Sequence, residues 1–333
     1  MHNVIGLDVG HSAVKLAATA NGRTLRLVVP SFVCPAIEIA DEAEQRRADK
    51  ETVMVGGRPY FVGETARLQG QLKNPIGTYD SWISTPEYAA LILGAFKKAA
   101  AEGIDIDKPR LVLGLPTHLF SQQKDVLNGV VSDLVQVDHL MVMPQPVGAY
   151  HATMLDEYGL PLAHRSMATQ TWCVVDIGYY TTDFLVIQKG RFVQNAMGSC
   201  AGMRFAAEHL VSLLTRKGLA TDIQEAEEAL INRSIKYFAH RQDVGREVDL
   251  ALAKNVTEVT DTLGRTISAI ARQMDGLVVA GGGGGLIFPF IKAIYPTAML
   301  ATDSRFAVAE GMRRFGCAVR RIKPLSTASA ATV

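Results

Sequence analysis

Residues Ile5-Gly6-Leu7-Asp8-Val9-Gly10-His11-Ser12 form the most informative segment of the chain, because an apolar run there ends in an aspartate, an apolar residue and a glycine. A hydroxyl-bearing turn follows, and residues 13–18 are again mostly apolar, which predicts a strand, a tight turn and a second strand. Glycine allows the close approach that lets backbone amides point into such a turn and bind phosphate oxygens. The aspartate at the strand end can face a hydrated magnesium ion.

The same pattern occurs again in the middle of the chain, at Val175-Asp176-Ile177-Gly178-Tyr179-Tyr180-Thr181-Thr182-Asp183. A second apolar run, Phe184 to Ile187, follows this turn as well. One turn of this kind is a weak signal, because it arises by chance in many loops. Two of them predict two halves that face one nucleotide, and a chain of 333 residues is long enough for two domains.

Composition excludes several classes of protein. With 34 basic and 33 acidic residues, the chain shows no overall charge that would attract nucleic acid or an acidic membrane. Its four cysteines lie far apart and form no Cys-x-x-Cys pair, which argues against a zinc site or a disulfide scaffold. The sequence shows neither a signal-like N-terminal segment nor an apolar run of roughly 20 residues. We therefore expect a cytoplasmic protein that binds no membrane.

Apolar patterning predicts the main elements. Helices are expected over residues 88–101, 147–157, 203–215, 223–230 and 244–274, and strands over 25–29, 110–116, 140–143, 172–175 and 277–280. The strand 110–116 ends in a Gly and Pro turn, a place where α/β proteins commonly bind ligands. Residues 41–51 are polar and charge-dense, and residues 160–171 are expected to link the two halves.

Five consecutive glycines, Gly281 to Gly285, follow the strand 277–280. Such a run loses roughly 1 kcal/mol of stability per glycine relative to alanine, so it needs a reason. It lies directly between a Val-rich strand and the apolar residues Leu286 to Ile291. That position favours backbone contact with a flat ligand over a flexible linker.

In this order, the motifs resemble those of the actin, hexokinase and heat-shock-chaperone ATPase superfamily. The matching segments cover nearly the whole chain: phosphate 1 at residues 8–15, connect 1 at 144–149, phosphate 2 at 176–183, the adenosine motif at 278–286 and connect 2 at 306–312. The closing segment Ala309 to Gly316 is most similar to that of the ParM/StbA-type bacterial actins that segregate plasmids. Other short actin-like proteins share that segment.

The resemblance implies an α/β fold with two RNase H-like, actin-type domains around a nucleotide cleft, each with a smaller subdomain. Domain I would comprise residues 1–160, with a small subdomain at about 31–80, and a C-terminal helix at about 306–320 would complete it. Domain II would comprise residues 161–305, with a helical subdomain at about 205–274. Residues 324–333, rich in Ser, Thr and Ala, are expected to be a disordered tail.

The resemblance also implies three catalytic residues, Asp8, Gln145 and Asp176. Asp8 and Asp176 would hold magnesium through its waters, and either carboxylate could help to polarise the attacking water. Gln145 cannot take a proton at neutral pH, so it would orient that water. Simpler roles remain open: the two aspartates as strand-end caps, and Gln145 as a helix cap.

The implied cofactors are ATP or ADP with Mg²⁺. Gly10, His11 and Ser12 would wrap the phosphates by their backbone amides, which makes the His11 imidazole incidental. Lys15 would face phosphate as a compact charge, unless it is a solvated strand lysine.

The second half would supply the remaining nucleotide contacts. The phosphates would meet Gly178, Tyr179, Tyr180 and Thr181; the ribose would meet Gly202, Arg204 and Glu208; and the adenine would meet Gly282, Gly283 and Gly284. The two tyrosines depart from the small residues usual in the family, which leaves donation by their side chains open. Asp183 would brace the loop.

These implications favour a filament-forming ATPase that uses hydrolysis to control filament stability in plasmid or other DNA segregation. Its partners would be further copies of itself and a DNA-binding adaptor, with no direct nucleic-acid contact. A superfamily small-molecule kinase is the first alternative, although Gly114 to His118 offers no aspartate to deprotonate an acceptor. A nucleotide-dependent regulatory protein that does not polymerise is the second. A chaperone is disfavoured, because only a short segment follows the nucleotide motifs.

Overall fold

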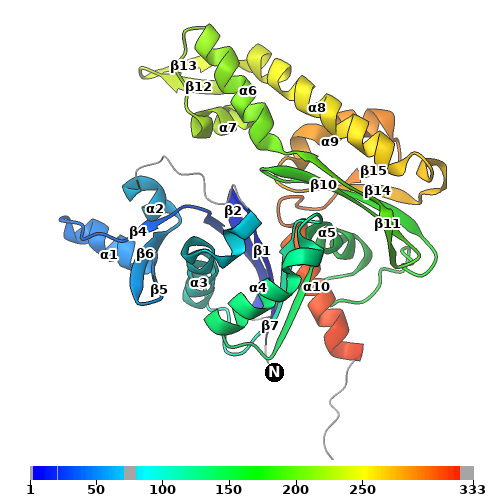
Figure 1. The fold of residues 1–333 in the computed structure, drawn as a ribbon, viewed down its shortest axis with the longest axis horizontal. Helices are drawn as coiled ribbons and strands as arrows, with labels where there is room; N and C mark the ends of the chain where they lie inside the picture. Colours follow the sequence, from blue (N-terminus) through cyan, green and yellow to red (C-terminus); the bar gives the residue numbers. More distant parts are fainter. Residues whose placement is uncertain (1–2, 21, 71–79, 323–333) are drawn as a thin grey trace, which may run out of the picture.

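Two five-stranded sheets form the framework of the protein (Figure 1). The computed structural model describes residues 3–20, 22–70 and 80–322. The first sheet has the order β3-β2-β1-β7-β8, with bounds β1 (Val4–Val9), β2 (Ala13–Ala20), β3 (Arg23–Pro30), β7 (Arg110–Leu115) and β8 (His139–Pro144). The second has the order β11-β10-β9-β14-β15, with bounds β9 (Thr171–Ile177), β10 (Thr181–Gln188), β11 (Arg191–Ala201), β14 (Gly276–Ala280) and β15 (Ala298–Leu300).

The two sheets repeat one topology. In each, the strand that carries the Asp-x-Gly motif pairs antiparallel with the next strand and parallel with a later one: β1 with β2 and β7, and β9 with β10 and β14. Both motif strands are fully buried, which explains their unbroken apolar runs. The repeated motif thus corresponds to a repeated α/β unit, as expected for two similar domains.

A small three-stranded sheet of order β4-β6-β5 follows the first hairpin. Its elements are β4 (Val33–Pro35), α1 (Glu42–Lys50), β5 (Thr52–Val55), β6 (Arg58–Val62) and α2 (Glu64–Gln69). The helix α1 covers the stretch for which the sequence predicted no element. Asp41 caps it by accepting from the Glu44 amide at 2.8 Å, and Ala48 is its one buried residue. A helix with so narrow a buried face gives no apolar periodicity to detect.

Helices cover both sheets. In the first half they are the 3₁₀ helix η1 (Asp80–Ser84), α3 (Pro86–Ala101), α4 (Phe120–Leu134), which the sequence did not predict, and α5 (Gln145–Met154). In the second they are α6 (Met203–Arg216), α7 (Ile223–Asn232), α8 (Gly245–Ile267), η2 (Ala271–Gln273) and α9 (Gly284–Ile294), with the hairpin β12 (Ser234–Tyr237) and β13 (His240–Asp243). The helix expected over 244–274 ends earlier, because its series of buried residues stops at Ile267.

The final helix α10 (Ala307–Ile322) lies against the first half and crosses α5 at very short range. A Cβ atom on Gly311 would lie 1.7 Å from the Gly148 carbonyl oxygen, so neither helix could carry a side chain at this crossing. Arg313, 2% exposed, donates to Glu310 on the same helix and to the Glu157 carbonyl. These contacts give a structural role to the closing segment that the sequence analysis singled out.

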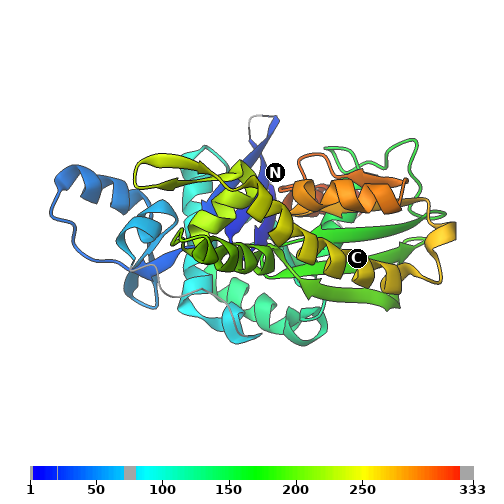
Figure 2. The same ribbon diagram turned by 90° about the horizontal axis from the view of Figure 1, so that it is seen from above.

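A third apolar core joins the two halves. It contains residues of α5, β8 and α10 together with Trp172 and Val174 of β9 and Val278 of β14. Figure 2 shows the small sheet with α1 at one end of the molecule and α9 with the second sheet at the other. Within the described ranges, no helix combines the length and apolar character needed to cross a membrane. The expected tail at 324–333 lies outside the described residues.

Candidate functional site

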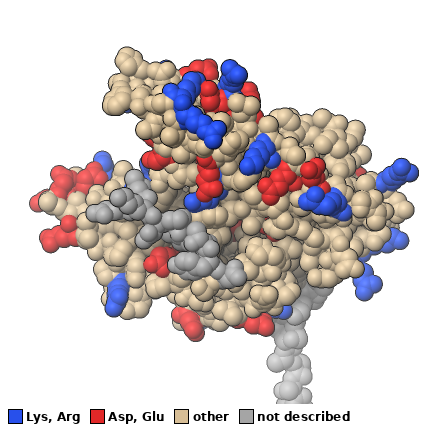
Figure 3. Space-filling model, turned by 45° about the horizontal axis from the view of Figure 1, so that its top comes forward, with Lys and Arg blue, Asp and Glu red and all other residues tan. Residues whose placement is uncertain are grey.

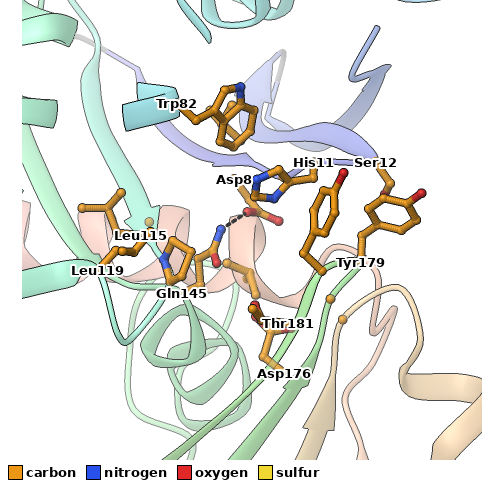
Figure 4. Close-up of a pocket in the computed structure, with 18 of the residues that line it drawn as sticks. Asp8, His11, Ser12, Trp82, Leu115, Leu119, Gln145, Asp176, Tyr179 and Thr181 are labelled. Carbon is orange, nitrogen blue, oxygen red and sulfur yellow. Dashed lines mark hydrogen bonds between the residues drawn. The ribbon is translucent and has the colours of Figure 1, made fainter. Parts of the chain in front are cut away.

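A cavity of about 250 Å³ opens between the two Asp-x-Gly turns (Figure 4). Its walls come from the β1–β2 turn, the β9–β10 turn, the segment between β7 and α4, and the start of α5. Eleven of the residues predicted for the site line it: Asp8, Gly10, His11, Ser12, Lys15, Gln145, Asp176, Gly178, Tyr179, Tyr180 and Thr181. The structure therefore brings the two turns, which lie far apart in sequence, to one cavity.

Asp8 is buried at the end of β1, where two side chains bind its carboxylate. Lys15 donates from Nζ to Asp8 Oδ2 at 3.1 Å, and Gln145 donates from Nε2 to Asp8 Oδ1 at 2.9 Å (Figure 4). Strand register explains the first contact, because Asp8 and Lys15 are cross-strand partners. Lys15 is therefore not a solvated strand lysine, and the Gln145 side chain binds Asp8 instead of capping α5.

Asp176 has the equivalent place in the second half, but its cross-strand partner is Asp183. Its pKa is raised to about 7, first by burial and then by the negative charges of Asp8 and Asp183, while Lys15 acts in the opposite direction. Thr181 Oγ1 donates to Asp183 Oδ2 at 2.8 Å, so Asp183 braces the turn as expected. Like charges thus face each other in the second turn, whereas opposite charges do in the first.

This donor set fits a magnesium ion held through water. Two buried carboxylates face one cavity, and the pKa of Asp176 is raised first by burial and then by nearby negative charge, which a divalent cation would neutralise. Among the residues the structure describes, no three His, Cys, Asp or Glu side chains group closely enough to hold a metal. An ion here would take its other ligands from water and phosphate, as magnesium commonly does.

The pKa of Asp176 predicts a pH-dependent stability. Because its folded-state pKa lies near 7 and its ordinary value is 3.8, the native chain holds the extra proton between these values, and stability from this group falls as pH rises from about 4 to 7. Without nucleotide or metal, Asp176→Asn is expected to raise the free energy of unfolding at pH 8 by a few kcal/mol at most. The gain is expected to vanish near pH 4.

Thermal or urea unfolding at the two pH values, in the presence of a chelator, measures this difference. Asp133→Asn on the exposed face of α4 is the matched control and is expected to change stability at neither pH. An equal effect of Asp176→Asn at pH 4 and pH 8 would contradict the prediction.

The two tyrosines of the second turn connect it to helices α6 and α7. Tyr179 donates its hydroxyl to Glu227 of α7, and burial together with this carboxylate raises the pKa of Tyr179. Arg204 of α6 donates to the Tyr180 hydroxyl at 3.0 Å and to Glu208 at 2.7 Å. The bulky residues that depart from the family pattern therefore tie the turn to α6 and α7.

The His11 imidazole packs against aromatic rings in the cavity wall, and its expected lack of a role toward nucleotide stays a prediction. It stacks on Trp82 of η1 with ring centroids 4.1 Å apart, and it meets the edge of Tyr180 at 4.6 Å. Nothing in the sequence linked these three residues, because they lie on three separate segments. The ring of His11 thus contacts both walls of the cavity.

The residues predicted for ribose and adenine do not line this cavity: Gly202, Arg204, Glu208, Gly282, Gly283 and Gly284. Packing explains part of the glycine run. Gly281 lines the cavity at a φ of 86°, and a Cβ on Gly283 would lie 2.4 Å from Met203 Cγ. At Gly282 a Cβ would meet nothing within 4 Å, so contact with a ligand remains a prediction there.

Sequence reasoning missed several lining residues: Trp82, Ile83, Tyr88, Leu119, Gln123, Arg305 and Val308. Trp82 and Tyr88 come from η1 and the first turn of α3, and their place depends on tertiary packing. The Gly and Pro turn after β7 was a usable signal, since Gly114, Leu115, Pro116 and His118 all line the cavity.

Comparison with known families supports this arrangement. A family model described as Actin like proteins N terminal domain matches residues 6–148, and one described as Archaeal actin homologue MreB-like, C-terminal, matches residues 174–293. No curated protein sequence matched the chain. The two matched regions each contain one of the Asp-x-Gly turns.

Solved structures share the fold over nearly the full chain. A ParM filament from Clostridium botulinum is 20% identical, with 95% of this chain and 99% of that chain covered and a TM-score of 0.73. The archaeal actin homologue Ta0583 is 20% identical, with 93% and 98% covered and a TM-score of 0.73. ParM of Bacillus thuringiensis, solved with ATP, is 14% identical, with 97% and 100% covered and a TM-score of 0.65. The chain therefore has the actin-like protein fold, which confirms the expected fold class.

Proposed function

We propose that the chain binds ATP with magnesium in the cavity between its two turns, polymerises in that state, and hydrolyses ATP to weaken the filament. One observation carries this proposal: a turn from each half reaches the same cavity, with Asp8, Asp176 and Gln145 on its walls. Domain I would comprise residues 1–160 with the helix at about 306–320, and domain II residues 161–305. A ligand held by both turns would then bridge the two domains.

Each residue has a role that follows from its contacts. The amides of Gly10 to Ser12 and of Gly178 to Thr181 would bind phosphate oxygens. Magnesium, when bound, would neutralise charge that develops on the transferred phosphoryl group. Gln145 donates to Asp8, which supports the proposal that its amide group would orient a water beside that carboxylate. Asp8 and Asp176 would receive the hydrogen bonds of metal-bound waters.

Filament formation is supported by relatives and by the fold. The ParM of Clostridium botulinum has been solved as a 15-stranded filament. If the closed, ATP-bound form polymerises best, then polymer must also retain ATP more tightly than the free chain does, because the coupling is reciprocal. Hydrolysis would remove that preference.

A small-molecule kinase is less well supported. Such an enzyme needs a carboxylate that deprotonates the acceptor hydroxyl. Of the described residues that line the cavity, only Asp8 and Asp176 are carboxylates, and the proposal places both at the metal. A non-polymerising regulatory protein would keep the same site, so assembly is the property to measure.

Sedimentation tests the assembly. With ATP and magnesium, a large fraction of the chain is expected to enter the pellet and to form filaments by electron microscopy, whereas ADP should leave most of it in the supernatant. A non-hydrolysable ATP analogue should give filaments that persist. A chain that binds ATP but stays in the supernatant at high concentration would favour the regulatory alternative.

Any link to DNA is proposed to pass through an adaptor protein. On the face shown in Figure 3, basic and acidic side chains are interspersed and form no broad basic surface. The formal net charge of +1 likewise provides little attraction for the phosphate backbone of DNA. Tight, salt-sensitive binding of the purified chain to plasmid DNA would overturn this part of the proposal.

A further inference from the structure

One ring contact spans the cavity between the two turns. His11, from the β1–β2 turn, meets the edge of Tyr180, from the β9–β10 turn, with ring centroids 4.6 Å apart and ring planes at 78°. Edge-to-face geometry at this distance is the favourable arrangement for two aromatic rings. We call this the cross-cavity ring contact. It joins the two segments whose backbone amides would hold the phosphates.

Aromatic packing within the first half holds the His11 ring in place. His11 stacks on Trp82 with the ring planes at 22°, and Trp82 meets the edge of Tyr88 at 4.9 Å. Trp82 is 7% exposed and Tyr88 is 1% exposed, so both rings are part of the packed first half. In Figure 4, His11 lies between Trp82 and the facing turn that carries Tyr179.

Contacts with Arg204 and Tyr179 hold the Tyr180 ring in place. The Arg204 guanidinium lies 5.2 Å from the centre of the Tyr180 ring and also donates to its hydroxyl. The Tyr179 ring meets the edge of the Tyr180 ring at 4.9 Å, while its hydroxyl donates to Glu227. The ring of Tyr180 is therefore fixed relative to α6 and α7, and the contact with His11 holds two preformed surfaces together.

We propose that the cross-cavity ring contact competes with the nucleotide, so that phosphates must separate His11 from Tyr180 before both turns can bind them. Both side chains line the cavity, and both belong to the turns that supply the binding amides. The inference rests on the proposed nucleotide binding and adds a regulation to it. His11 and Tyr180 are positioning residues here, since they act by holding the turns.

The size of the effect follows from the strength of such a contact. If the contact must open first, the apparent dissociation constant is the intrinsic one divided by the fraction of open molecules. Aromatic pairs of this geometry correspond to a factor of about 2 to 10 in an equilibrium constant. Removing the contact is therefore expected to tighten nucleotide binding by about that factor, mainly through faster association.

Three variants test this with a fluorescent ADP and magnesium in stopped-flow binding. Tyr180→Ala removes the ring and is expected to bind about 2 to 10 times more tightly. Tyr180→Phe keeps the ring and loses only the bond to Arg204, so it is expected to stay within about twofold of the unaltered chain. Phe238→Ala, at the exposed β12–β13 turn, is the matched control and should change nothing.

A double-variant cycle separates the contact from a general loosening of the turn. His11→Ser with Tyr180→Ala is expected to bind no more tightly than the better single variant, because both remove the same contact. Fully additive gains would contradict the proposal. Weaker or unchanged binding in a folded Tyr180→Ala chain would also contradict it, since the ring would then support the site.

Tryptophan fluorescence gives a second readout that leaves His11 and Tyr180 unaltered. Trp82 stacks on His11, whereas Trp172, the other tryptophan, is buried in the core between the halves. Adding ADP and magnesium is expected to change the emission of the unaltered chain but not that of Trp82→Phe. Absence of any nucleotide binding by the unaltered chain would defeat the proposed function. Binding without a Trp82 signal would defeat only the competition.

Discussion

Asp176→Ala is expected to lower the rate of ATP hydrolysis by roughly 100-fold or more, while nucleotide binding is largely retained. The variant keeps the amides of Gly178 to Thr181, which would hold the phosphates, but loses the buried carboxylate that faces the cavity. Charge stabilisation by a correctly placed metal is worth several kcal/mol, which sets the scale of the loss. Phosphate release under saturating ATP and magnesium measures the rate, and a fluorescent nucleotide measures the binding.

The matched control is Asp133→Ala, which removes an exposed aspartate from α4 away from the cavity. Its hydrolysis rate should equal that of the unaltered chain. Filaments of Asp176→Ala are expected to form with ATP and to persist, because the step that weakens them is slow. Unchanged turnover in Asp176→Ala would mean that the second turn does not hold the metal.

Gly311→Ala is expected to destabilise the fold by about 3 kcal/mol or more, at the upper end of what overpacking usually costs. The new methyl group would lie 1.7 Å from the Gly148 carbonyl oxygen and 2.6 Å from the Ala152 amide nitrogen. Both of these atoms belong to the backbone of α5, so a side-chain rotation cannot relieve the clash. α10 would have to move away from α5, which also contributes to the core joining the two halves.

Gly129→Ala provides the matched control for this prediction. Gly129 also lies inside a helix, α4, but a Cβ there would meet nothing within 4 Å. The same substitution at this position should stabilise the chain by about 0.5 to 1 kcal/mol, because alanine is the better helix former. Thermal unfolding of both variants should therefore move in opposite directions. A Gly311→Ala chain as stable as the original would show that α5 and α10 do not cross as described.

The sequence predicted the elements whose apolar patterns are strong. Buried strands such as β1 and β9 read as continuous apolar runs, and α7 carried a capping signature at Asp222 and Glu225 that the structure contains. Helix α1 and helix α4 bury too few residues to leave a clear period. The end of α8 could not be predicted either. After the helix stops, the partly buried apolar side chains of Ile270, Ala271 and Met274 still pack against the core, so the apolar pattern continues.

For the site, local motifs identified what the backbone of each turn supplies. They could not show which side chains meet across the cavity, because His11, Trp82 and Tyr180 come together only through the packing of separate elements. Family resemblance drew attention away from His11, since its usual counterpart has no ring. The sequence also did not show that Gly202 packs closely against Tyr179 and Gly283 against Met203, because such packing is a tertiary property.

The unequal cross-strand pairs bear on which species can enter the cavity. Asp8 faces Lys15 across the first hairpin, whereas Asp176 faces Asp183 across the second. When all three are ionised, Asp8, Asp176 and Asp183 outnumber the cations Lys15 and Arg305, and this excess of negative charge repels a bare polyphosphate. If the chain binds ATP as proposed, the second half of the duplication is expected to favour a nucleotide that arrives already bound to its metal, with free ATP as the weaker ligand.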